Sequence, residues 1–199
     1  MKIINIYFLF LMVTLNIVTN SFAQKKTFFS GSVDLVAPQS KQYFYNNSAN
    51  HIFRDNIIEN GFLLNSFGFK AGYYYPIFKK LYLGIWTGFQ SDTKEKFAAI
   101  KLGGEIKFYV YDIDNMYFYL LDGNNFTLNK SKYKSGNNLR AGLGFPIIRK
   151  KNYNINLKLF WEQNYFTLDG ADKLLGYPDE IPRNLTVHSY GISFGVMVK

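Results

Sequence analysis

The stretch FAAIKLGGEIKFYVY, residues 97–111, decides the fold class. Two sets of side chains alternate along it with a period of two. One set is mostly large and apolar: Ala98, Ile100, Leu102, Gly104, Ile106, Phe108 and Val110. The other set holds the charges: Phe97, Ala99, Lys101, Gly103, Glu105, Lys107 and Tyr109. Successive side chains of a strand point to opposite faces, whereas a helix would scatter both sets, so the stretch is predicted to be a β-strand.

The same alternation recurs along the chain. It is clear in residues 139–147, 153–165 and 189–198, and weaker in residues 29–35, 63–73 and 81–90. Residues 116–121 are apolar on both faces, which leaves the orientation of that strand open. Together these segments predict about eight strands, several of them near the ten residues that a strand needs to cross a membrane.

The predicted connections alternate in length. Residues 76–80, 112–115 and 149–152 form brief turns, whereas residues 38–60, 122–138 and 168–184 are long and polar; residues 91–96 are the one short connection on the long-loop side. A rim of tight turns opposite a rim of long loops is typical of outer-membrane barrels. No linker divides the chain into further domains.

The size of the side chains indicates which face lies inside. An eight-stranded barrel has an interior only just wide enough for side chains, so the small and polar face fits there and the bulky face does not. Water would not tolerate a bulky apolar belt of this extent, but lipid does. The prediction is an all-β, antiparallel, up-and-down transmembrane β-barrel of about eight strands. A soluble barrel with the apolar face inward is the alternative.

The N-terminus is typical of an exported precursor. Lys2 precedes a mostly apolar run over residues 3–18, and Ser21-Phe22-Ala23 places small residues before a cleavage point. The sequence therefore predicts a signal peptide over residues 1–23 and an outer-membrane β-barrel domain over residues 24–199, located in the bacterial outer membrane. An uncleaved N-terminal anchor is the alternative reading of the same run.

Eight charged side chains fall on the predicted inward face. They are Asp34, Lys70, Lys101, Glu105, Lys107, Arg140, Lys158 and Glu162. Both signs are present, and charges in a narrow interior must pair to be tolerated. We expect a lumen charge network that plugs the barrel; a narrow channel for ions or small solutes is the alternative.

Two groups of residues are expected at the rims. The tyrosines 73–75, Tyr109, Tyr111 and Tyr153 lie close to the short turns and suit an interfacial aromatic girdle. The cluster Lys130, Lys132 and Lys134, in a long loop, is a candidate contact for lipopolysaccharide phosphates, with a solvated loop as the alternative.

Little in the sequence indicates catalysis. A lipid-modifying site could use only the pair His188 and Ser189, with Glu180 as a third member, but adjacent strand residues point to opposite faces. The chain has no cysteine and two histidines, and no metal site or cofactor is expected. Its net charge of +9 is not accompanied by a basic and aromatic reading surface, so nucleic-acid binding is not expected either.

The signal peptide, the alternating strands and the closing strand over residues 190–198 resemble the small outer-membrane β-barrel family of the OmpX or OmpA-barrel type. We expect a monomer without enzymatic activity that contacts outer-membrane lipids and lipopolysaccharide. The resemblance implies insertion by the barrel assembly machinery, and the long loops on a plugged barrel predict a role in envelope structure or surface interaction. Members usually end on an aromatic residue, whereas this chain ends Val198-Lys199.

Overall fold

A computed structural model describes residues 27–47, 51–58, 66–93, 97–128, 133–134, 136–168 and 170–199. The predicted signal peptide lies outside these residues, as do Lys130 and Lys132. The strands are β1 (Phe28–Asn46), β2 (Ile52–Ile58), β3 (Ser66–Pro76), β4 (Leu81–Asp92), β5 (Phe97–Tyr109), β6 (Tyr117–Thr127), β7 (Gly136–Arg149), β8 (Tyr153–Thr167) and β9 (Ile181–Val198). Within the described part of the chain, no helix is long and apolar enough to cross a membrane.

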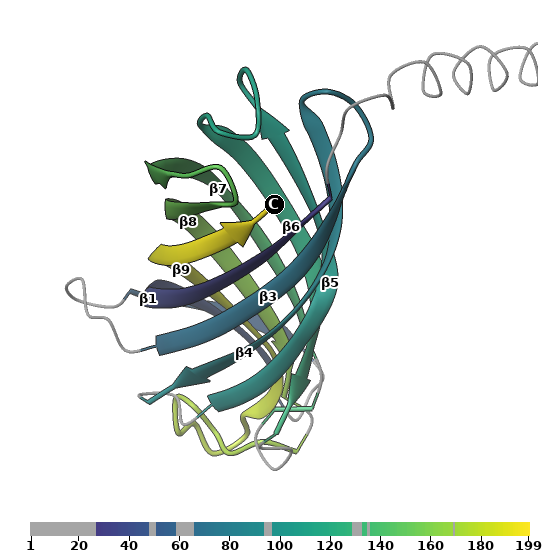
Figure 1. The fold of residues 1–199 in the computed structure, drawn as a ribbon. Helices are drawn as coiled ribbons and strands as arrows, with labels where there is room; N and C mark the ends of the chain where they lie inside the picture. Colours follow the sequence, from purple (N-terminus) through teal and green to yellow (C-terminus); the bar gives the residue numbers. More distant parts are fainter. Residues whose placement is uncertain are drawn as a thin grey trace, which may run out of the picture.

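The strands form one antiparallel sheet that closes on itself (Figure 1). Its order is β2-β1-β3-β4-β5-β6-β7-β8-β9, and a further pairing of β1 with β9 completes the ring. Strands β1 and β3–β9 are the eight strands of the barrel. The predicted eight-stranded antiparallel barrel is therefore confirmed.

Strand β1 is much longer than predicted, and the expectation of a loop over residues 38–60 is wrong. Residues 40–46 pair with β9 on one side and with β2 on the other. The ladder shifts register between Pro38 and Ser40, and a proline is tolerated there because a bulge leaves one backbone position unpaired. The bulge also reverses which positions are buried: Val36 is buried before it, and Lys41 and Tyr43 after it.

The other two long loops are also shorter than predicted. Strand β6 runs to Thr127, β7 begins at Gly136, and β9 begins at Ile181. Their asparagines suggested a loop, yet Asn125 and Asn138 are buried strand residues that hydrogen bond inside the barrel. Polar residues that face a polar lumen look like loop residues in sequence.

The outward face of the barrel is apolar. Exposed large apolar side chains stand on every barrel strand, among them Phe29, Phe69, Ile85, Leu102, Ile106, Phe118, Leu120, Leu139, Leu159 and Phe194. Strand β6, whose orientation the sequence left open, turns Phe118, Leu120 and Phe126 outward and Tyr117, Tyr119 and Leu121 inward. Asp122 and Asn124 are polar exceptions on the outward face of this strand.

The interior is less uniform than predicted. It was expected to hold small and polar side chains, but it also holds large rings: Phe28, Tyr74, Tyr82, Trp86, Tyr109, Tyr117, Tyr119 and Phe160 are all buried. Several of these rings lie against a glycine of the neighbouring strand. Tyr74 pairs with Gly84, Tyr117 with Gly144, and Phe160 with Gly191. A Cβ added at Gly144 would lie 2.1 Å from Tyr117 Cζ, so the missing side chain makes room for the ring.

Candidate functional site

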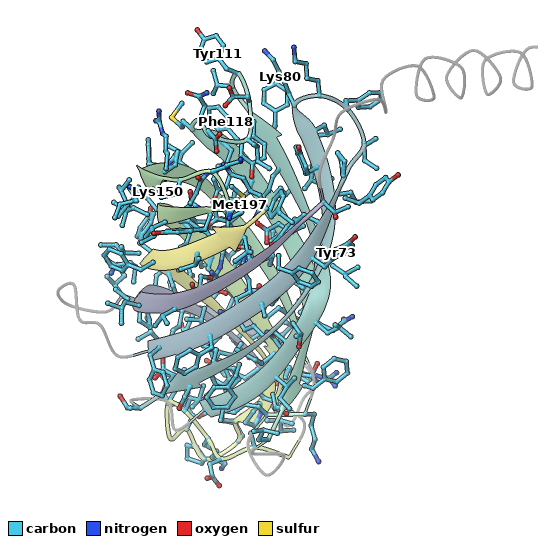
Figure 2. All side chains as sticks on the ribbon, viewed as in Figure 1. Tyr73, Lys80, Tyr111, Phe118, Lys150 and Met197 are labelled. Atoms are coloured by element: carbon cyan, nitrogen blue, oxygen red, sulfur yellow. The ribbon has the colours of Figure 1, made fainter. Side chains whose placement is uncertain are left out.

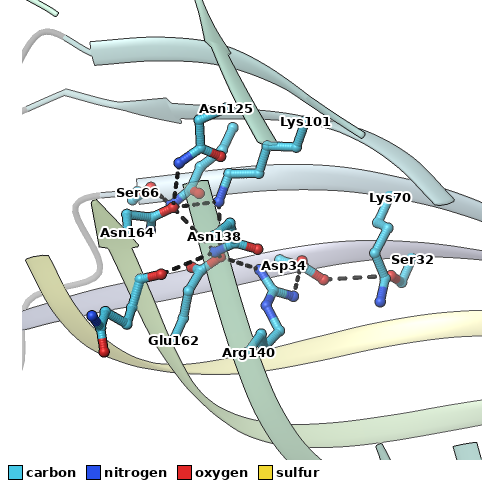
Figure 3. A network of polar contacts seen from close by, with 12 residues as sticks. Ser32, Asp34, Ser66, Lys70, Lys101, Asn125, Asn138, Arg140, Glu162 and Asn164 are labelled. Carbon is cyan, nitrogen blue, oxygen red and sulfur yellow. Dashed lines mark hydrogen bonds and ion pairs between the residues drawn. The ribbon is translucent and has the colours of Figure 1, made fainter. Parts of the chain in front are cut away.

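The structure places all eight predicted charged residues inside the barrel. They come from β1, β3, β5, β7 and β8, and every one of them is buried. Figure 3 shows five of them, Asp34, Lys70, Lys101, Arg140 and Glu162, in a network where carboxylates and cations from different strands meet. Because each of these residues alternates with an apolar outward neighbour, strand geometry alone is enough to bring them together.

Glu162 is the centre of one cluster. Its Oε1 accepts hydrogen bonds from Lys101 Nζ at 2.8 Å, Asn138 Nδ2 at 2.6 Å and Arg140 Nη2 at 3.1 Å. Lys101 Nζ also donates to Asn164 Oδ1 at 2.8 Å. The carboxylate therefore has two cationic partners and one amide partner, which offset the cost of burying its charge. All three bond Oε1, and the buried Oε2 has no hydrogen-bond partner in the described part of the chain.

Arg140 joins this cluster to a second carboxylate, that of Asp34. Its Nη1 donates to Asp34 Oδ2 at 2.5 Å while Nη2 reaches Glu162. The guanidinium carbon lies 3.9 Å from the centroid of the Phe160 ring. A planar guanidinium can bridge two carboxylates and stack on an aromatic ring at once, which an ammonium group cannot do as well.

Glu105 is the centre of a second cluster, closer to the short turns. Its Oε2 accepts hydrogen bonds from Lys70 Nζ and from Tyr74 Oη, both at 2.7 Å. Lys107 Nζ lies 3.7 Å from Glu105 Oε1 and 3.5 Å from the centroid of the Tyr74 ring. The tyrosine thus contacts both the carboxylate and a lysine through different parts of the same side chain.

Lys158 is less well satisfied than the other charged residues. It is buried, and within the described part of the chain its Nζ has no hydrogen-bond partner. The eight residues comprise five cations and three carboxylates. Charge is balanced in the Glu162 cluster, where Lys101 and Arg140 face Glu162 and Asp34. The Glu105 cluster and Lys158 each leave one positive charge in excess.

Apolar layers lie on both sides of the charges. Mostly toward the short turns lies the aromatic layer: Phe28, Val36, Tyr74, Tyr82, Tyr109, Tyr117, Tyr119, Phe160 and Met197, with Ile113 against it. Two of its members reach the level of the charges, because Phe160 lies between Lys158 and Glu162 along β8 and Val36 follows Asp34 along β1. Toward the long loops lies the outer apolar layer: Tyr43, Tyr45, Phe97, Ala99, Tyr133, Phe166, Leu168, Leu185 and Val187, with Ala171, Leu174 and Leu175 against it. Figure 2 shows the described side chains along the whole length of the barrel.

The segment over residues 170–180 closes the outer apolar layer and is held by one carboxylate. Glu180 Oε1 accepts hydrogen bonds from Tyr43 Oη at 2.5 Å and from the Leu174 amide at 2.8 Å. Its Oε2 accepts from the Leu175 and Tyr177 amides, both at 3.2 Å. Burial raises the pKa of Glu180, but these hydrogen bonds outweigh it and hold the pKa below the usual 4.5.

The cavities inside the lumen are small. One, of about 20 Å³, lies in the outer apolar layer between Phe97, Tyr133 and Phe166; another, of about 10 Å³, lies among Asp34, Lys70 and Arg140. Each has room for about one water molecule. Neither is large enough to hold an organic ligand.

The remaining predicted residues are spread over the molecule. Lys134 lies at the end with the long connections, and its amide donates to the Thr167 carbonyl at 3.0 Å. His188 stacks on Trp161, whereas Ser189 is buried, so the two do not face each other. Glu180 accepts hydrogen bonds from Tyr43 and from backbone amides. Among the described residues, no group of three or more metal-ligating side chains could hold a metal ion.

The predicted aromatic girdle is partly wrong. Tyr73, Tyr75, Tyr111 and Tyr153 are exposed, but Tyr74 and Tyr109 are fully buried in the aromatic layer. The misplacement follows from treating consecutive tyrosines as one group, because adjacent strand residues must point to opposite faces. The contact of Tyr43 with Glu180 was not foreseen, since residues 38–60 were expected to be a loop.

Comparisons with known proteins give similarity of fold. No protein-family model and no curated protein matches the chain. Similar solved structures include the outer membrane protein AlkL, with 10% identity, a TM-score of 0.48, and coverage of 89% of this chain and 92% of that chain. Neisserial surface protein A has 14% identity, a TM-score of 0.43, and coverage of 88% and 99%. OprG from Pseudomonas aeruginosa has 10% identity, a TM-score of 0.44, and coverage of 86% and 94%. At these values the likeness says nothing of activity, and the resemblance to the OmpX or OmpA-barrel type stays a prediction.

Proposed function

We propose that this chain is an integral protein of the bacterial outer membrane, with a plugged lumen and no enzymatic activity. In this proposal it acts in envelope structure or surface interaction through the loops at its outer end. The observation that carries the proposal is the layering of the lumen: buried ion pairs lie between two apolar layers. A lumen filled in this way favours a barrel that does not conduct over a pore.

The outward face supports the membrane location. Side chains such as Phe69, Ile85 and Phe194 are more than half exposed, and comparable residues stand on every barrel strand. Soluble monomers rarely expose a continuous apolar surface of this extent. A bilayer accepts it, because the closed ring leaves no strand edge of the barrel unpaired.

The outer end supports the surface role. Strand β2 and the outer part of β1 extend the sheet beyond the ring, and Ile52 and Ile58 on β2 are about three-quarters exposed. Lys134 lies at the same end of the barrel, where its amide donates to the carbonyl of Thr167, the last residue of β8. The cluster Lys130, Lys132 and Lys134 would supply cations for lipopolysaccharide phosphates at this end.

Planar-bilayer recording tests the plugged lumen. The wild-type barrel is expected to give no conductance steps. A triple variant, Lys101→Ala, Arg140→Ala and Glu162→Ala, removes the cluster around Glu162 and serves as the opened control. Discrete conductance steps from the wild-type protein would contradict the plug and favour a narrow channel.

Deletion of residues 171–179 tests the surface role. The barrel is expected to insert as before but to lose its effect on envelope integrity, measured by detergent sensitivity of cells that lack the wild-type gene. The control keeps the full length of this segment and carries two substitutions at exposed positions in it, Asp172→Asn and Asp179→Asn. Full complementation by the deletion variant would count against a role for this loop.

A further inference from the structure

The rim formed by the short turns carries an excess of positive charge. We call it the cationic rim and define it by residues 77–80, 110–116, 149–152 and 199. It contains six cations, Lys79, Lys80, Arg149, Lys150, Lys151 and Lys199, against two carboxylates, Asp112 and Asp114. The connections at the opposite end, residues 47–65, 93–96, 128–135 and 168–180, contain seven cations and seven carboxylates in total. The excess is therefore a property of one rim and does not simply reflect the basic composition of the chain.

Both carboxylates of the cationic rim are already occupied. Asp114 pairs with Lys199 and accepts a hydrogen bond from Asn154 Nδ2 at 2.7 Å. Asp112 Oδ1 accepts hydrogen bonds from the Asp114 amide at 2.9 Å and from Asn115 Nδ2 at 2.6 Å. They serve to hold their own turn and the C-terminus in place.

The other five cations of the rim are exposed and form no ion pair in the described part of the chain, although the charge of Arg149 helps to lower the pKa of Asp114. They are Lys79, Lys80, Arg149, Lys150 and Lys151. Within the described ranges, none of them lies within 4.0 Å of a carboxylate oxygen. Five solvated cations on one rim form a surface that attracts anions.

A row of exposed apolar and aromatic residues lies immediately inside this rim. Tyr153 pairs with Val198, Val198 with Phe29, and Phe29 with Tyr73, so the four stand side by side across β8, β9, β1 and β3. All four are exposed on the outward face. Aromatic side chains gather at the level where the hydrocarbon of a bilayer meets its headgroups. The cations beyond this row are therefore at the depth of the headgroups.

The turns also hold the cations in place. Lys80 Nζ lies 5.6 Å from the centroid of the Tyr111 ring and donates to the Val110 carbonyl at 2.8 Å, and its own carbonyl accepts from the Tyr109 amide. The Lys199 amide donates to the Asn152 carbonyl at 2.9 Å. Figure 2 shows Lys80 and Tyr111 together at this end of the barrel. Neighbouring turns are thus joined, and binding there would order little additional chain.

We propose that the cationic rim binds the phosphate headgroups of anionic phospholipids in the leaflet that meets the short turns. Lysine and arginine at a membrane surface are attracted to anionic headgroups and only weakly to zwitterionic ones. The rim would then fix the depth and orientation of the barrel from the side opposite to its long loops. This inference does not depend on whether the lumen conducts.

Lipid binding by the folded mature chain tests the proposal. The protein in non-ionic detergent is mixed with equal amounts of phosphatidylglycerol and phosphatidylcholine, and bound lipids are counted by native mass spectrometry. The rim variant carries Lys79→Gln, Lys150→Gln and Lys151→Gln. The matched control removes three exposed cations from the other end: Arg54→Gln, Lys173→Gln and Arg183→Gln.

Wild type and control are expected to prefer phosphatidylglycerol by about tenfold, and the rim variant to lose most of that preference. Equal binding of both lipids by wild type, or an unchanged preference in the rim variant, would overturn the proposal. Should the rim variant not fold, wild type is measured at rising salt, where the preference must fall as charges are screened. Complete displacement of phosphatidylglycerol by millimolar inorganic phosphate would also overturn it, because the site would then take the free anion.

Discussion

At the scale of the residue, the buried charges show how strongly each group depends on its partners. Asp34, Glu105 and Glu162 are buried almost completely, and each has at least one cation within 2.5–2.8 Å. Removing one member of such a set leaves the others charged and unpaired in a medium of low polarity. The resulting loss of folding free energy is usually larger than the stabilisation that the ion pair had contributed.

Glu162→Gln is expected to destabilise the barrel by about 3 kcal/mol, because Lys101 and Arg140 would share one fewer counter-charge. Urea unfolding in phospholipid vesicles measures the change. The control is Asp172→Asn, which removes a carboxylate from an exposed position of the segment 170–180. Equal stability of the two variants would show that the Glu162 cluster is not held together by charge.

Removal of a different carboxylate, that of Asp122, is expected to stabilise the protein. Asp122 is exposed on the outward face and pairs with Gly104, near the middle of β5. A carboxylate on the lipid face of a barrel is destabilising, so Asp122→Ala is expected to stabilise the protein in vesicles by about 1 kcal/mol. The same unfolding assay measures it. A neutral or destabilising effect would indicate that this part of the wall faces water.

At the scale of the element, periodicity predicted most of the structure, and the failures have local causes. Alternation alone predicts a strand over residues 97–111 whose three charged residues share one face, and side-chain volume predicts that this face is the inward one. Alternation is lost at Pro38, where a bulge shifts the register, and β1 beyond it was therefore read as loop. Strand β6 alternates bulky rings with bulky aliphatic residues, so only the pairing with its neighbours reveals its inward face. Long-range contacts, such as that between Tyr43 and Glu180, leave no signal in a single sequence.

The pairing of rings with glycines predicts a specific steric effect. In Gly144→Ala the new Cβ would meet the Tyr117 ring, which is packed inside the aromatic layer and has little room to move. We expect a loss of about 1–3 kcal/mol in unfolding free energy. Gly31→Ala is the control, since nothing lies within 4 Å of a Cβ there. Equal effects at both glycines would mean that backbone conformation, and not ring packing, decides the result.

The segment 170–180 is expected to loosen in acid. The folded-state pKa of Glu180 lies below its usual 4.5, so its stabilising effect is complete above pH 4.5 and is lost as the pH falls through the folded-state pKa. Hydrogen-exchange protection of the Leu174, Leu175 and Tyr177 amides, corrected for intrinsic rates, should fall over that range. Glu180→Gln should show weak protection at every pH. A variant with the wild-type pH dependence would show that another group holds the segment.

At the scale of the whole molecule, three layers fill one narrow barrel. The charges lie between the aromatic layer and the outer apolar layer, and the apolar wall surrounds all three. Volume alone correctly predicted that the charged face turns inward, although the interior also admits rings wherever a glycine faces them. This arrangement places large apolar side chains on the outside of the fold, and a bilayer is the solvent that suits them.

The chain has no cysteine, so single cysteines can be introduced along β5 without background labelling. Spin labels at residues 100–108, in protein reconstituted into vesicles, test the orientation of the wall most directly. Labels at Ile100, Leu102, Ile106 and Phe108 should be accessible to oxygen dissolved in lipid and protected from a water-soluble nickel reagent. Labels at Lys101, Glu105 and Lys107 should be protected from both. Outward positions open to the nickel reagent would contradict a membrane-facing wall.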